Sequence, residues 1–196
     1  MPTMLDGVSA TVNNKAAFVY YISPTQVNIL TPLDTATGAV PVQVTSQFGT
    51  SAVVSATVTP YAPGLFIIYE SNNQYPAAQH STDYSLVGPP GLIPGVTTTP
   101  AQPGETIVLY GTGFGLPVTA IVPASLTQTG LLPTPWPAFT IGNVPANVVY
   151  ASLVTPGLYQ FNVIVPASAP NGDNAISATY NGAITQSGLF VPVQHQ

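Results

Sequence analysis

The chain has 196 residues, of which only 4% are charged; one lysine and six acidic residues give a formal net charge of −5. Nucleic acid and anionic membrane surfaces are therefore excluded as partners, because both are bound through clusters of Lys and Arg. Cysteine is absent from the sequence, which excludes disulfides and thiolate metal sites. No apolar run is long enough to span a membrane, so we expect no membrane insertion.

The first part of the chain alternates apolar and polar residues with a period of two, and Gly, Pro and Asn separate the alternating stretches. This pattern is typical of short β-strands joined by turns. Strands are predicted at residues 8–13, 17–22, 26–31, 39–45, 51–59 and 64–70. Residues 1–70 are therefore expected to form a first immunoglobulin-like (Ig-like) module.

Residues 71–102 are rich in Asn, Gln, Ser, Pro and Gly, which is the composition of a linker. A second module is predicted over residues 103–196, with a Pro-rich insertion at 116–137. Its strands are expected at residues 104–110, 138–142, 146–151, 158–165, 174–180 and 188–193. The predicted fold class is all-β, with two tandem Ig-like β-sandwich modules joined by a Pro/Gly/Asn-rich linker.

An internal repeat relates the two predicted modules at a spacing of 134 residues. Its first copy contains Gln26-Val-Asn28, Pro32 and Gly38, and its second copy contains Gln160-Phe-Asn162, Pro166 and Gly172. The second module begins with an extra segment, residues 103–115, that has no equivalent ahead of Val8. The first module is therefore predicted to lack its opening strand, and an unfilled sheet edge invites pairing with another chain.

Four stretches, residues 7–14, 21–28, 62–66 and 103–113, carry a resemblance to a known family. The chain resembles the C-terminal domains of large secreted bacterial proteins, chiefly of acidobacteria, with IPT/TIG-type Ig-like modules. The resemblance implies an extracellular or cell-surface setting, with any export signal upstream of residue 1, and it implies no particular activity.

Asp83 and Glu105 are the candidate catalytic residues, because a pair of carboxylates hydrolyses glycosides when held about 5 to 10 Å apart. Both flank the predicted linker and are expected to meet at the module interface; Glu70 is a third candidate. The alternative is that Glu105 begins a strand and binds local backbone. His80, Ser81 and Asp83 also bring together three catalytic residue types, but the sequence contains no Gly-x-Ser-x-Gly elbow, which favours polar linker contacts.

Metal and phosphate sites find little support in the sequence. The glycines at 111–115 lack the spacing of a nucleotide-binding loop and are expected to form a tight turn. Residues 170–174 offer oxygen ligands but lack the rest of a calcium loop, so a plain turn is expected. No metal or cofactor is predicted.

Aromatic side chains in irregular segments give a second functional lead. Trp136, Tyr75 and Tyr84 are candidates for a carbohydrate-stacking platform, although Trp136 packing its own Pro-rich loop is the simpler interpretation.

Three hypotheses follow, and a non-enzymatic function is preferred. The leading one is an extracellular structural, adhesive or assembly module that acts through sheet-edge contacts with other copies or with the upstream part of its parent protein. The alternatives are a carbohydrate-binding module and a glycan hydrolase.

Overall fold

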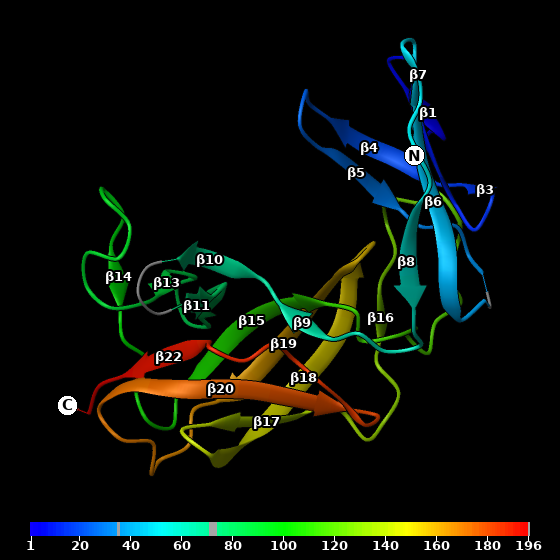
Figure 1. Ribbon diagram of the computed structural model, residues 1–196. Helices are drawn as coiled ribbons and strands as arrows, with labels where there is room; N and C mark the ends of the chain where they lie inside the picture. Colours follow the sequence, from blue (N-terminus) through cyan, green and yellow to red (C-terminus); the bar gives the residue numbers. More distant parts are fainter. Residues whose placement is uncertain (35, 71–73, 196) are drawn as a thin grey trace. The chain divides into compact units, whose positions relative to one another are not determined.

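The computed structural model describes residues 1–34, 36–70 and 74–195 (Figure 1). Every regular element assigned in these ranges is a β-strand, which confirms the all-β prediction. Within the same ranges, no helix has the length and apolar character needed to cross a membrane. The chain divides into two compact units: unit 1 comprises Met1–Pro60 and Ala120–Gln128, and unit 2 comprises Tyr61–Thr119 and Thr129–Gln196.

Unit 1 contains one sheet built around two central strands and one separate hairpin. In the sheet, β2 pairs with β1, β3 and β6, and β6 also pairs with β7 and β8; the hairpin is formed by β4 and β5. The strands are β1 (Met4–Leu5), β2 (Val8–Val12), β3 (Lys15–Ala16), β4 (Phe18–Ile22), β5 (Val27–Leu30), β6 (Gly38–Ser46), β7 (Gly49–Thr50) and β8 (Val54–Val58).

The core of unit 1 is small because its buried side chains are small. Ala10, Val12, Ala17 and Val40 form its fully buried cluster, and partly exposed residues such as Ile29 pack against them. Alternation along β2 and β6 places Ala10, Val12 and Val40 on one face of the sheet, as the period-two pattern predicts.

Unit 2 contains one large connected sheet in the order β14-β13-β12-β15-β19-β18-β17-β20-β21, with β22 also paired to β20. Its strands are β9 (Gly64–Leu65), β10 (Ile67–Glu70), β11 (Gln74–Pro76), β12 (Ala78–His80), β13 (Leu86–Val87), β14 (Thr98–Thr99), β15 (Thr106–Thr112), β16 (Gly130–Leu131), β17 (Ala138–Ile141), β18 (Val144–Thr155), β19 (Leu158–Ile164), β20 (Gly172–Tyr180), β21 (Ala183–Ile184) and β22 (Phe190–Val193).

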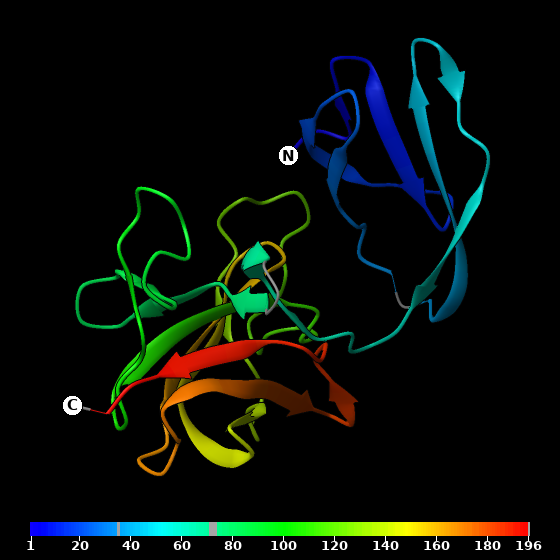
Figure 2. The ribbon, with the colours of Figure 1, turned by 60° about the vertical axis from the view of Figure 1, so that its left-hand side comes forward.

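The long strand β18 joins the two layers of unit 2. Its first residues pair with β17 and its later residues with β19, so the sheet folds over a shared core (Figure 2). The layers enclose large side chains: Phe114, Phe161, Ile107 and Leu109 are fully buried, and Phe139 is 1% exposed. This core is larger than that of unit 1.

The segment predicted as a linker contributes β11, β12, β13 and β14 to unit 2 over its described residues, 74–102. β12 pairs along one edge of β15, and Ala101 forms a β-bridge to Val193, the last residue of β22. The physical reason is that sheet pairing uses backbone groups, so a polar composition does not prevent it. Of the Pro-rich insertion, residues 120–128 group with unit 1, and β16 pairs with β18 in unit 2.

The 134-residue repeat appears in the structure as equivalent hydrogen bonds. Gln26 Nε2 donates to Asn28 Oδ1 at 2.6 Å on β5, and Gln160 Nε2 donates to Asn162 Oδ1 at 2.9 Å on β19.

A second equivalent pair of hydrogen bonds involves β6 in unit 1 and β20 in unit 2. Val44 N donates to Ser51 Oγ at 3.1 Å, and Ala178 N donates to Thr185 Oγ1 at 3.0 Å. The β4–β5 and β18–β19 pairings also share an irregularity at the same point, between Val19 and Tyr21 and between Val148 and Tyr150. β5 and β6 of unit 1 are therefore the structural counterparts of β19 and β20.

The glycines at 111–115 allow another backbone segment to approach. β9 pairs with β15 at Gly111 and Thr112, and Ala62 N donates to Gly113 O at 2.9 Å. Gly113 has a φ of +78°, and a Cβ atom there would lie 1.9 Å from Ala62 O. The glycines thus serve close backbone packing.

Gly113→Ala is expected to destabilise unit 2 by roughly 2–4 kcal/mol, because it combines left-handed backbone strain with a clash against backbone. Urea unfolding measures the change. The matched control is Gly104→Ala, since Gly104 has a similar φ of +83° but open space around the added methyl group. Equal losses in the two variants would show that the close approach of Ala62 is unimportant.

Candidate functional site

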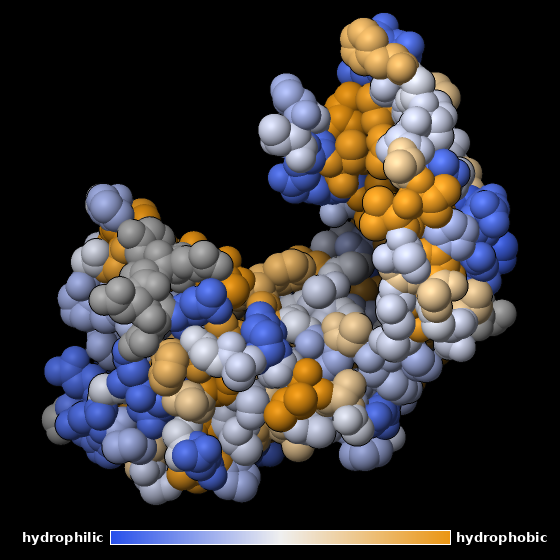
Figure 3. All heavy atoms as spheres, viewed as in Figure 1, coloured by the Kyte–Doolittle hydropathy of each residue, from blue (hydrophilic) through white to orange (hydrophobic). Residues whose placement is uncertain are grey.

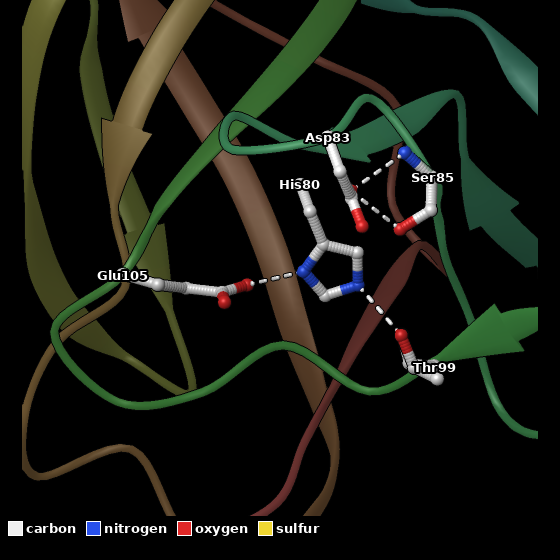
Figure 4. A network of polar contacts seen from close by, with 5 residues as sticks. All are labelled: His80, Asp83, Ser85, Thr99 and Glu105. Atoms are coloured by element: carbon white, nitrogen blue, oxygen red, sulfur yellow. Dashed lines mark hydrogen bonds and ion pairs between the residues drawn. The ribbon is translucent and has the colours of Figure 1, made fainter.

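A polar network surrounds His80 at the end of β12 in unit 2 (Figure 4). The His80 side chain is nearly buried; its Nδ1 lies 3.0 Å from Glu105 Oε1, and its Nε2 lies 2.9 Å from Thr99 Oγ1. Nε2 is also 3.3 Å from the Thr99 carbonyl oxygen. The imidazole therefore links β12 to β14 and to the residue just before β15.

The two candidate carboxylates are engaged separately within this network. Asp83 Oδ1 accepts hydrogen bonds from Ser85 N at 2.9 Å and from Ser85 Oγ at 2.7 Å, and these bonds lower the pKa of Asp83. Glu105 faces the other side of His80 (Figure 4). The side chain of Glu70 lies outside the described part of the structure. This geometry favours the structural interpretation of Asp83 and Glu105, in which each stabilises local chain.

Glu105, His80 and Thr99 follow the carboxylate–imidazole–hydroxyl order used in acyl transfer. Such a reaction also requires hydrogen-bond donors for an oxyanion close to the hydroxyl. The nearby Gly88 N donates instead to Thr99 O at 3.0 Å, within the pairing of β13 with β14. The contacts of this network fasten short strands to one another.

Among residues 1–34, 36–70 and 74–195, no group of three or more His, Cys, Asp and Glu side chains is placed to hold a metal ion.

The three candidate aromatics occupy different environments. Tyr75 is 6% exposed and donates through its hydroxyl to Asp173 Oδ2 at 2.9 Å, so its ring face is not available for stacking. Trp136 is partly buried, with Nε1 donating to Leu132 O at 3.1 Å. Tyr84 is 64% exposed on a turn. Of the three, only Tyr84 presents a largely open ring.

The free edge of β5 in unit 1 is the second candidate site. Its counterpart β19 pairs with β18 on one edge and with β15 on the other. β5 pairs with β4, and none of the described strands pairs with its second edge. That the first module lacks its opening strand remains a prediction from the sequence.

The free edge leaves apolar side chains partly exposed. On β19, Phe161 and Val163 are fully buried, with Leu109 and Ile107 of β15 as their cross-strand neighbours. At the equivalent positions on β5, Val27 and Ile29 remain partly exposed. Figure 3 shows hydrophobic atoms at the surface of unit 1 around β5 and β6.

Backbone groups of β5 also point to the free edge. Ser23 and Gln26 exchange two backbone hydrogen bonds at the end of the β4–β5 hairpin, at 2.8 and 3.4 Å. Because successive residues of a strand direct their backbone groups to opposite edges, Val27 and Ile29 direct theirs away from β4. The repeat in the sequence indicates the missing strand. Which amides of β5 do not bond to β4 is shown only by the pairing of the hairpin.

Comparisons with known proteins add little to this geometry. No protein-family profile and no curated protein matches the chain. Among solved structures, the chain aligns with SGBP-B of the mixed-linkage glucan utilization locus of Bacteroides ovatus, in complex with a mixed-linkage heptasaccharide. The identity is 12% and the TM-score 0.32; the alignment covers 95% of this chain and 37% of that one. A similarity at this level carries no argument about function.

The backbone directions on β5 predict its hydrogen exchange. The amides of Val27 and Ile29 are expected to exchange at least about 100-fold faster than those of Phe161 and Val163, because the latter are paired with β15. Exchange measured by NMR tests this prediction. The internal control is Asn28, whose amide faces β4 and should be protected; equal rates along β5 would contradict the assignment of the free edge.

His80→Ala is expected to destabilise unit 2 by roughly 1–3 kcal/mol, because it leaves the buried Glu105 Oε1 atom without its partner. Thermal or urea unfolding measures the loss. Asp83→Asn is the control on the exposed side of the network and should cost less. Unchanged stability in the His80 variant would argue against a structural role.

Proposed function

We propose that the chain is a non-catalytic extracellular element, built from two Ig-like β-sandwich modules of the family that the sequence resembles, with a structural, adhesive or assembly role. It acts by pairing the free edge of β5 with an extended segment of another polypeptide. The observation that supports this role is the unpaired edge itself, with Val27 and Ile29 partly exposed beside it.

The local sequence of β5 supports the proposal. Exposed sheet edges are usually protected by charged residues, proline or bulges on the edge strand. β5 reads Val27-Asn-Ile-Leu30, so it carries none of these residues, and the irregularity of the hairpin lies on β4. In unit 2 the equivalent edge is covered by β15, whose own outer edge is covered by β12. An edge left without protection in one copy alone favours a binding role.

Carbohydrate binding is the alternative, and the exposed ring of Tyr84 is the feature that favours it. A polysaccharide pull-down with Tyr84→Ala as the variant tests it. Glycan hydrolysis is less favoured, because Asp83 and Glu105 already have partners within the protein.

A display library of random peptides ten residues long tests the proposed function. We expect selected peptides to lose binding to Val27→Pro by roughly tenfold or more, since proline removes an amide that points to the free edge while leaving the β4 pairing intact. The control is Val27→Thr, which keeps both the amide and the β-branched shape. Binders that retain their affinity for Val27→Pro, or a library without binders, would contradict the proposal; circular dichroism verifies that both variants fold.

A further inference from the structure

We infer that the segment accepted by β5 has the sequence pattern of β15 and binds antiparallel, in the register that β15 adopts on β19. This inference rests on the proposed function and specifies its partner. Its basis is internal to the molecule: unit 2 shows how a strand fills the position beside β19, and no described strand occupies the equivalent position beside β5.

The register follows from the repeat. In unit 2, Ile107 lies opposite Val163, and Leu109 lies opposite Phe161. Subtracting the spacing of 134 residues places the Ile107-like residue of the partner opposite Ile29. The Leu109-like residue lies opposite Val27 in the same way.

The side chains that the partner supplies must be apolar at these two alternating positions. Ile107 and Leu109 are fully buried in unit 2, where they lie directly beside Val163 and Phe161 in the same sheet. In unit 1 the corresponding surface includes Val27, Ile29 and Val42, all partly exposed. A polar residue at either position of the partner would be buried against these side chains without a hydrogen-bond partner, which disfavours such segments.

The partner is a separate segment and not β15 of a second copy. β15 pairs with β12 on one edge and with β19 on the other, and its Ile107, Val108 and Leu109 are buried. A second copy would have to open its unit 2 to donate this strand. The occupant is therefore a strand-forming peptide of the same pattern, presented in extended form by another polypeptide.

The backbone of β15 also determines which amides of the partner engage β5. Tyr110 N donates to Ala77 O at 3.2 Å, away from β19. By alternation, the amides of Ile107 and Leu109 face β19. In the complex, the amide of the partner's Leu109-like residue should be hydrogen-bonded to β5. The amide of its Tyr110-like residue should face away from β5.

The test uses a fluorescein-labelled peptide with the sequence of residues 104–113 and three modified forms, titrated into the intact chain by fluorescence anisotropy. We expect saturable binding of the unmodified peptide. N-methylation at Leu109 should weaken binding roughly tenfold or more, whereas N-methylation at Tyr110 should change it by less than about threefold. Replacing both Ile107 and Leu109 of the peptide with Ser should abolish binding.

The outcomes separate this inference from the function on which it rests. Equal effects of the two N-methyl groups, or binding of the Ser-substituted peptide, would overturn the register and the pattern. If library peptides bind at β5 but the 104–113 peptide does not, the inference fails and the proposed function stands. If no peptide of either kind binds, both fail.

Discussion

The pairing of β15 with β19 lies at the centre of the large sheet of unit 2. It satisfies the second edge of β19, places Ile107 and Leu109 beside Val163 and Phe161, and provides a new edge on which β12 pairs. β9 also pairs with β15, at its last two residues, Gly111 and Thr112. β15 thus hydrogen-bonds to β19, contributes side chains to the core, and holds β12 of the segment that precedes it.

Unit 1 shows what the same design becomes without that strand. Its β4–β5 and β2–β6 pairings reproduce the register of unit 2, including the irregularity beside Tyr21 and Tyr150. Its core, however, has Ala10 where unit 2 has Phe139, and the position of the buried Phe161 is taken in unit 1 by the partly exposed Val27. Fewer apolar atoms are removed from water when unit 1 folds, so burial of its core contributes less to its free energy of folding.

Much of the fold could be predicted from the sequence, because alternation marks strands such as β2, β6 and β19 directly. The strands between residues 74 and 99 could not, since they are two or three residues long and pair through backbone groups that leave no side-chain pattern. The carboxylates Asp83 and Glu105 were identified as candidates by type, but their partners Ser85 and His80 depend on turns that composition does not specify. A free sheet edge in the first copy of the repeat could be predicted from the sequence, because comparing the two copies indicates a strand that only the second copy contains.

The small core of unit 1 has a thermodynamic consequence. A ligand that binds only the folded form raises the apparent stability of that form in proportion to the logarithm of its concentration. A strand that adds apolar residues to a core made of Ala10, Val12, Ala17 and Val40 would supply a large share of the folding free energy of the whole unit. Folding of unit 1 and occupancy of β5 would then be one coupled equilibrium, so the midpoint of its thermal unfolding would report the presence of the partner.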